Sequence, residues 1–196
     1  SHPSPSEIEQ EIINTFNNID KNLAYKDIKK LSTKYHKNIN VLNVLSQIAQ
    51  KMGDVDTTIN SLKKILLLDK SNIECISKIY KLLLTKSLLD EALANINLIL
   101  RIDKDHYEAI RDKAYIYFLK NNFDKAEKYI DNISKLQEKD FFAYNIKGLI
   151  YFKNSNFHEA KNYFEQAIKL NSKYVDGYNN LGICLLELEK LDEAYT

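Results

Sequence analysis

The amino-acid sequence predicts an all-α protein built as a solenoid of helix-turn-helix repeats. Three observations support this fold class. The chain has 196 residues but only four glycines and two prolines, a composition typical of helices joined by short loops. A pattern of large and small residues recurs at a constant interval, and an alanine recurs at the same interval in the segment that follows. Each unit therefore consists of two helices that pack through small side chains.

The pattern is clearest near the C-terminus. Tyr144-Asn-Ile-Lys-Gly148-Leu-Ile-Tyr151 is followed, one interval later, by the similar string Tyr178-Asn-Asn-Leu-Gly182-Ile-Cys-Leu185. A large residue, a glycine four places on and another large residue three places later form one helix face with a notch. Phe157-His-Glu-Ala160 and Leu191-Asp-Glu-Ala194 follow at equal offsets and supply a small residue to that notch. These motifs resemble the tetratricopeptide repeat (TPR), which has the same period, about 34 residues.

The same period extends over the chain without an insertion. It predicts a linker or cloning remnant at 1–4, an atypical N-terminal repeat at 5–38, repeats at 39–72, 73–106, 107–140 and 141–174, and a truncated repeat at 175–196. The packing place of the second helices is occupied by Ala24, Thr58, Ala92, Ala126, Ala160 and Ala194. The resemblance implies that these repeats form a right-handed superhelical solenoid.

Some places depart from the pattern. Tyr80 stands where other repeats have a small residue, so we expect the third repeat to be splayed or this ring to swing out. The second helix of the sixth repeat is broken off at Thr196, which predicts exposure of Leu181, Leu185 and Leu188. We infer that the natural protein continues, that this end docks on another molecule, or that the boundary is artificial.

Composition excludes several function classes. The net charge of +1 leaves no basic footprint for nucleic acid. No apolar run approaches the ~18 residues of a membrane span, and we expect a cytoplasmic protein. Cys75 and Cys184 lie on helices three repeats apart and are predicted to be free, buried thiols.

The sequence contains no motif for catalysis, metal binding or phosphate binding. Four scattered histidines do not supply the three or four convergent ligands of a metal site, and no phosphate-binding glycine loop or nucleophile motif occurs. Acidic residues at the start of second helices are interpreted as partners of the helix dipole. The sequence therefore predicts no catalytic residue, no cofactor, no metal and no enzyme activity.

The resemblance implies that first helices line a concave groove through their second, fifth, ninth, twelfth and thirteenth places. From these places we predict a partner-binding groove of Arg111, Tyr115, Phe118, Phe142, Asn145, Leu149, Phe152, Asn179, Ile183 and Leu186. Asn145 and Asn179 would hydrogen-bond the partner's backbone. The alternative is that Phe118 and Phe152 only pack between neighbouring first helices.

These observations predict a non-catalytic scaffold that binds a peptide or helix of another protein. Family members that grip the acidic C-terminus of chaperones carry Lys and Asn at the fifth and ninth places of one repeat. No repeat of this chain combines them, from Glu9 and Ile13 to Asn179 and Ile183, so no carboxylate clamp is expected. Two alternatives remain, namely a recruiting or regulatory arm of a larger protein or enzyme, and a module that self-assembles through its C-terminal end.

Overall fold

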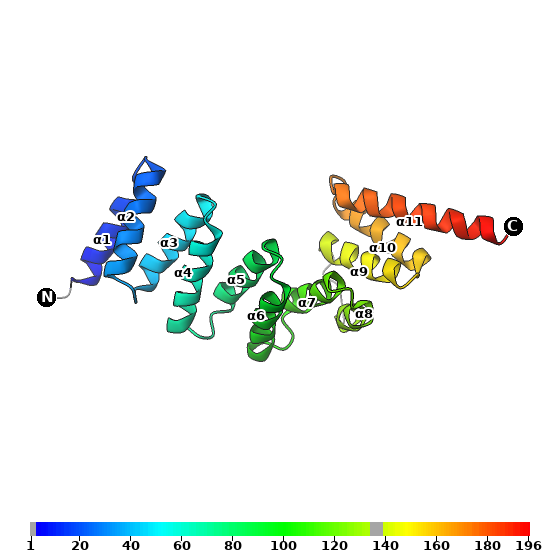
Figure 1. Cartoon of the computed structure of the whole chain (residues 1–196), viewed down its shortest axis with the longest axis horizontal. Coiled ribbons are helices and arrows are strands. Elements are labelled where there is room, and N and C mark those ends of the chain that lie inside the picture. Colours follow the sequence, from blue (N-terminus) through cyan, green and yellow to red (C-terminus); the bar gives the residue numbers. More distant parts are fainter. Residues whose placement is uncertain (1–2, 134–138) are drawn as a thin grey trace. The chain divides into compact units, whose positions relative to one another are not determined.

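The computed structural model describes residues 3–133 and 139–196, which form eleven α-helices and no strand (Figure 1). The helices are α1 (Pro5–Phe16), α2 (Lys21–Lys34), α3 (Ile39–Lys51), α4 (Val55–Leu68), α5 (Ile73–Thr85), α6 (Leu89–Ile102), α7 (Tyr107–Leu119), α8 (Phe123–Asp131), α9 (Phe141–Lys153), α10 (Phe157–Leu170) and α11 (Val175–Ala194). Consecutive helices pack as hairpins, and each hairpin contacts the next within its unit. The chain divides into an N-terminal unit, Ser1–Ile102, and a C-terminal unit, Asp103–Thr196.

The turns inside the hairpins recur at the repeat period. Gly53, Ser87, Asn121 and Ser155 adopt positive φ values of 58–77° and are equally spaced along the chain. The residue after each donates its backbone N–H to a carbonyl five places back, as Asp54 does to Ala49 at 2.9 Å. This left-handed cap satisfies carbonyls at the helix end and reverses the chain.

The equivalent place in the sixth repeat is Glu189, and here the sequence expectation is wrong. No turn forms, and α11 runs on to Ala194 as one helix. Glutamate is a good helix former and disfavours the left-handed conformation, so nothing at this place ends the helix. The partial second helix expected around Ala194 is therefore the last turn of α11, and the Ala194 side chain is exposed.

The starts of the first helices also follow the period. Asn38, Asn72, His106 and Asp140 each accept a hydrogen bond from the backbone N–H three residues on. Such caps stabilise a helix by about 1 kcal/mol each. The corresponding residue before α11 is Tyr174, whose side chain makes no cap hydrogen bond.

Of the small residues expected between paired helices, Ala126, Gly148 and Ala160 are confirmed at such a contact and Gly182 is not. Ala126 and Ala160 are fully buried, and Gly148 is buried against the ring of Phe164. Gly182 differs, because a Cβ there would meet nothing within 4 Å. Tyr80 is fully buried, so its ring does not swing out.

The two thiols behave as expected from the sequence. Cys75 and Cys184 are free and buried. Each sulfur donates a hydrogen bond of 3.1 Å to a backbone carbonyl, that of Leu62 for Cys75 and that of Phe157 for Cys184. Burial raises the pKa of both thiols, and they act as small core residues.

Substitution by alanine should have opposite effects on stability at Gly148 and at Gly182. Gly148→Ala should lower the free energy of unfolding by about 1–2 kcal/mol, because its Cβ would approach the Phe164 ring to 2.5 Å and overpacking outweighs the better helix propensity of alanine. Gly182→Ala should raise it by about 0.5–1 kcal/mol, because the space is open. Urea unfolding followed by circular dichroism measures both values. Equal shifts in one direction would contradict the packing described here.

One acid-sensitive contact joins the first two hairpins of the N-terminal unit. Tyr25 in α2 donates its hydroxyl to Asp54, which also caps α4 by accepting from the Thr57 N–H at 3.0 Å and the Thr57 hydroxyl at 2.8 Å. The Tyr25 hydrogen bond, followed by those from Thr57, lowers the pKa of Asp54 to about 2. The carboxylate is thus held in its charged form in the folded state.

Tyr25→Phe should destabilise the chain by about 1 kcal/mol near neutral pH, where Asp54 is charged. Because the folded pKa is below the ordinary value of 3.8, this stabilisation is complete above pH 4 and is lost as the pH falls towards 2. Unfolding midpoints of both proteins between pH 2 and pH 7 measure the difference. A difference that stays constant down to pH 2 would show that Asp54 is not the partner.

Candidate functional site

Aromatic side chains from α7 and α9 form one cluster in the C-terminal unit. The ring of Tyr115 stacks on Phe118 at 6.3 Å between centroids and meets the edge of Phe142 at 5.5 Å. All three side chains are half-buried. Three predicted groove residues therefore lie together and present a partly exposed apolar surface.

Arg111 lies beside this cluster in a network of charged groups. Its guanidinium is 5.3 Å from the ring centroid of Phe142, and it donates from Nε to Asp112 at 2.8 Å and from Nη1 to Asp140 at 2.9 Å. Asp140 also accepts the Tyr107 hydroxyl at 2.9 Å and caps α9. This network ties α7 to the start of α9 and fixes the position of Phe142.

The guanidinium of Arg111 is directed at the chain's own carboxylates. Its side chain is only 14% exposed, and those of Asp112 and Asp140 are 6% and 11% exposed. Burial opposes the charge of Arg111, but hydrogen bonds and attraction from Asp112 and Asp140 outweigh it, and the pKa is raised. Arg111 thus links α7 to the start of α9.

A pocket of about 270 Å³ lies farther along α9. It is lined by Leu149, Phe152, Lys153, Phe164, Asn180 and Ile183, which come from α9, α10 and α11. Phe152 packs edge-on against Phe157 at 5.2 Å, and Ile183 is 52% exposed. The pocket therefore has an apolar wall with an amide and an ammonium group at its edge.

The two asparagines predicted for the groove, Asn145 and Asn179, differ in exposure. Asn145 is 3% exposed, and its Oδ1 accepts a hydrogen bond of 3.0 Å from Nδ2 of Asn180. This bond joins α9 to α11, so Asn145 has a role in packing. Asn179 is exposed, and neither it nor Leu186, which is 57% exposed, lines the pocket.

Three residues of the pocket are absent from the predicted set. Phe164 follows the packing Ala160 by four places, and its size is explained only by the empty notch of Gly148 opposite. Asn180 occupies a sixth place that the family pattern does not assign to the groove. Lys153 occupies the thirteenth place of its repeat, which the family pattern does assign to the groove, so the sequence contained the information needed to predict it.

Acidic groups border the aromatic cluster. Burial raises the pKa of Tyr115, and the nearby charges of Asp176 and Asp112 raise it further. Burial and Asp176 act in the same direction on Tyr174, which packs edge-on against Phe141 at 4.9 Å. Asp176 belongs to the first turn of α11 and is exposed, so it places a negative charge at this end of the surface.

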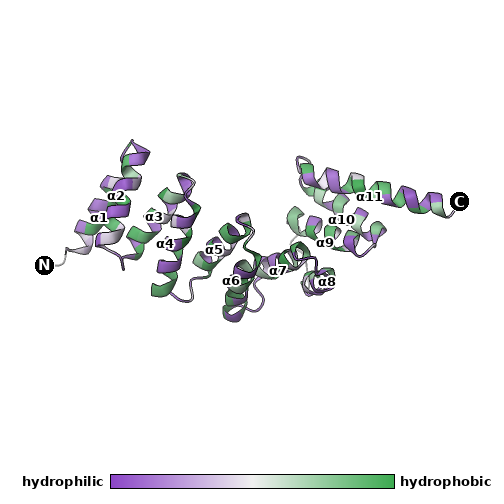
Figure 2. Cartoon of the chain, in the orientation of Figure 1, coloured by the Kyte–Doolittle hydropathy of each residue, from purple (hydrophilic) through white to green (hydrophobic). Residues whose placement is uncertain are grey.

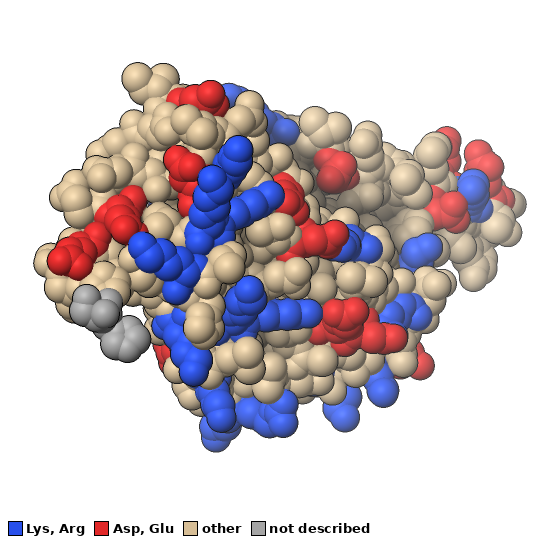
Figure 3. All heavy atoms as spheres, turned by 60° about the vertical axis from the view of Figure 1, so that its left-hand side comes forward, with Lys and Arg blue, Asp and Glu red and all other residues tan. Residues whose placement is uncertain are grey.

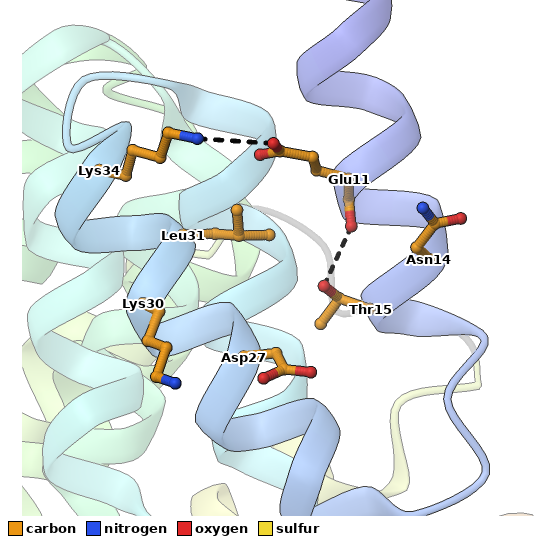
Figure 4. Close-up of a pocket in the computed structure, with 7 residues that line it drawn as sticks. All are labelled: Glu11, Asn14, Thr15, Asp27, Lys30, Leu31 and Lys34. Carbon is orange, nitrogen blue, oxygen red and sulfur yellow. Dashed lines mark hydrogen bonds and ion pairs between the residues drawn. The ribbon is translucent and has the colours of Figure 1, made fainter.

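A second pocket, of about 320 Å³, lies between α1 and α2 (Figure 4). Its lining combines both signs of charge in Glu11, Asp27, Lys30 and Lys34, and an ion pair of 3.5 Å links Lys34 to Glu11. No residue predicted for the groove lies in it. The mixed charges neutralise one another and give this pocket no selectivity for either sign.

Two structural findings bear on other functions. None of the helices in residues 3–133 and 139–196 combines the length and apolar character that crossing a membrane requires. Within the same residues, no group of three or more His, Cys, Asp or Glu side chains is placed to hold a metal ion.

Comparison with known proteins identifies the family of the C-terminal repeats. Residues 141–174 match a tetratricopeptide repeat model, and residues 163–196 match a second one. Residues 141–196 of this chain belong to the tetratricopeptide-repeat family. The TPR fold is generally that of a scaffold for protein–protein interactions, and TPR domains are generally non-catalytic.

Solved structures similar to this TPR chain share its fold. They include a tetratricopeptide repeat protein from Parabacteroides merdae ATCC 43184, with a TM-score of 0.77, 20% identity and coverage of 97% of this chain and 77% of that one. MamA from Desulfovibrio magneticus RS-1 has a TM-score of 0.69 and 16% identity over 80% of this chain and 89% of its own. YrrB, described as a TPR protein with an unusual peptide-binding site, has a TM-score of 0.62 and 15% identity over 83% and 84%. No curated protein matches the sequence significantly.

Proposed function

We propose that the C-terminal unit binds an apolar segment of a partner protein along α7, α9 and α11. The pocket of Leu149, Phe152 and Ile183 carries this proposal, because it is apolar, partly exposed and bordered by polar groups. Clustered apolar residues of this kind mark protein-binding sites. The chain acts as a non-catalytic scaffold in this function.

The chemistry of the surface specifies the partner segment. One large apolar side chain of the partner fits the pocket, and a second contacts the exposed edges of Tyr115 and Phe118. Asn180 and Lys153 line the pocket, and in this proposal they donate hydrogen bonds to carbonyl groups of an extended or helical backbone. Asp176 favours a basic residue near the aromatic cluster.

An acidic chaperone tail does not fit this surface. Binding such a tail requires free cationic groups, whereas the Arg111 guanidinium is paired with Asp112 and Asp140. The neighbouring Asp176 repels a carboxylate. The peptide-binding site described for YrrB, which shares the fold, supports a peptide as the type of occupant.

A peptide-display selection against the chain tests this function. The selected peptides should carry two large apolar residues and a basic residue. Their affinity, measured by fluorescence anisotropy, should fall at least tenfold for Ile183→Asp, because a charge would enter the apolar pocket. Ile183 is 52% exposed, so this change leaves the core intact.

Phe16→Asp is the matched control, since Phe16 is an apolar residue of similar exposure, 49%, in the N-terminal unit. It should leave peptide affinity unchanged. Peptides that bind the Ile183→Asp chain as tightly as the original one would place the binding surface elsewhere.

A further inference from the structure

The turn between α1 and α2 departs from the repeat period. Its central place, where later hairpins have Gly53, Asn121 and other residues with positive φ, is occupied by Ile19. A β-branched residue disfavours the left-handed conformation, and Ile19 does not adopt it. The turn is held instead by Asn18, whose Oδ1 accepts a hydrogen bond of 3.1 Å from the N–H of Asp20. The Ile19 side chain is left 98% exposed.

An apolar pocket of about 150 Å³ lies beside this turn. Residues of α1, the turn, α2 and α3 line it, among them Phe16, Ile19, Lys21, Ile48, Lys51 and Met52. The third helix, α3, carries apolar residues along much of its length (Figure 2). Ile48 also belongs to the core in which α3 packs on Ile28 of α2. The pocket therefore lies between the first two hairpins and has described helices on both sides.

The lining of this pocket combines apolar groups with two lysines. Phe16 and Met52 are 49% and 37% exposed, and Nζ of Lys51 is 5.6 Å from the ring centroid of Phe16. No acidic side chain lines the pocket. Within residues 3–133 and 139–196, neither Lys21 nor Lys51 is placed in an ion pair. Their charges are therefore available to a ligand in the pocket.

The acidic residues next to these lysines in the sequence are engaged in helix caps. Asp20 accepts the backbone N–H of Asn22 at 3.0 Å, and Asp54 accepts that of Thr57 at 3.0 Å and the hydroxyl of Tyr25. Lys and Arg outnumber Asp and Glu in the N-terminal unit, whereas the reverse holds in the C-terminal unit. Lysine and arginine side chains gather on the face of the molecule seen in Figure 3. The N-terminal unit therefore favours an acidic ligand.

We infer that this pocket, called the Phe16 pocket below, binds an acidic segment of a partner protein through one large apolar side chain. A cavity of about 150 Å³ accepts a group of the size of benzene, which matches a leucine or phenylalanine side chain. Carboxylates on both sides of that residue would pair with Lys21 and Lys51. The charge preference is opposite to that of the C-terminal surface, where Asp176 favours a basic residue.

An anionic lipid surface is the other ligand that exposed apolar groups beside lysines attract. It is less favourable here, because the Phe16 pocket is concave and has the volume of a single side chain. A protein segment fills such a pocket, whereas a lipid surface would contact only the protruding Ile19.

A peptide-display selection on the Ile183→Asp chain tests the site, because this substitution removes binding at the C-terminal surface. The selected peptides should carry a large apolar residue between acidic residues. Their affinity, measured by fluorescence anisotropy, should fall at least about tenfold when Ile19→Asp is added, since a like charge would meet the peptide at the edge of the pocket. Ile19 is 98% exposed, so this change leaves the core intact. Leu67→Asp, at a residue of α4 that is 75% exposed, is the matched control and should leave affinity unchanged.

Charge reversal tests the role of the lysines. Combined Lys21→Glu and Lys51→Glu substitutions should weaken the acidic peptides at least about tenfold. Lys63→Glu, at an exposed lysine of the same unit outside the pocket, should change affinity by less than about twofold. Peptides whose acidic residues are replaced by lysine should prefer the doubly substituted chain to the original one.

The outcomes separate this inference from the proposed function, since Ile19→Asp acts on the Phe16 pocket and Ile183→Asp on the C-terminal surface. Selected peptides that lack acidic residues, or that tolerate Ile19→Asp, would overturn the inference. Flotation with phosphatidylserine vesicles that is lost in Ile19→Asp would assign the pocket to a lipid surface instead. Self-association in sedimentation equilibrium that is lost in Ile19→Asp would assign it to a second copy of the chain.

Discussion

Replacing Phe164 by alanine should lower the free energy of unfolding by about 3–5 kcal/mol. The side chain is 1% exposed and lies between the notch of Gly148 and α11, where it packs with Cys184 and Leu188. No neighbour can fill the space, because Gly148 has no side chain to move into it. Chemical unfolding followed by circular dichroism measures the loss.

The control for this change is Phe16→Ala, at a phenylalanine that is 49% exposed. It should cost less than about 1 kcal/mol, since an exposed ring contributes little to the core. A similar cost for both variants would mean that the hairpin of α9 and α10 is not packed through Phe164. Phe164→Leu should in turn relieve part of the destabilisation caused by Gly148→Ala.

Arg111→Met should destabilise the C-terminal unit by about 3 kcal/mol. The methionine keeps the apolar stem but removes both hydrogen bonds to Asp112 and Asp140, whose carboxylates are 6% and 11% exposed. Removing one partner of a buried ion pair leaves charge without compensation, and that penalty dominates the effect. The unfolding midpoint in urea measures it.

The chain offers a matched control in Arg101, its only other arginine, which is exposed. Arg101→Met should change stability by less than about 0.5 kcal/mol. If both substitutions had equal effects, the Arg111 network would be a surface feature. Arg111→Lys should fall between these values, because it keeps the charge but loses the two-pronged geometry.

Some of the residues predicted for the groove lie together in the structure. Tyr115, Phe118 and Phe142 do cluster, and Leu149, Phe152 and Ile183 do line a pocket. Their place in the repeat was sufficient to bring them together, because helical spacing fixes which residues share a face. How a partner uses them stays a prediction.

The polar residues of the predicted site show why position in the repeat was insufficient to predict which side chains are available to a partner. Arg111 and Asn145 stand at groove places, yet each is engaged by the chain, Arg111 by Asp140 and Asn145 by Asn180. These contacts span 29 and 35 residues and depend on how successive hairpins stack. A local pattern does not contain that information.

The sequence by itself determined the helical hairpins, their constant period and the small residues between paired helices. These features depend on interactions within one hairpin, namely local propensity, side-chain volume and turn residues such as Gly53 and Asn121. They can therefore be recognised in the sequence. Only the tertiary structure decided that Tyr80 is buried, that Arg111 is paired inside, and that α11 continues past Glu189 with an open face. The reason is physical: these outcomes depend on whether a neighbouring helix is present to fill a space or satisfy a charge.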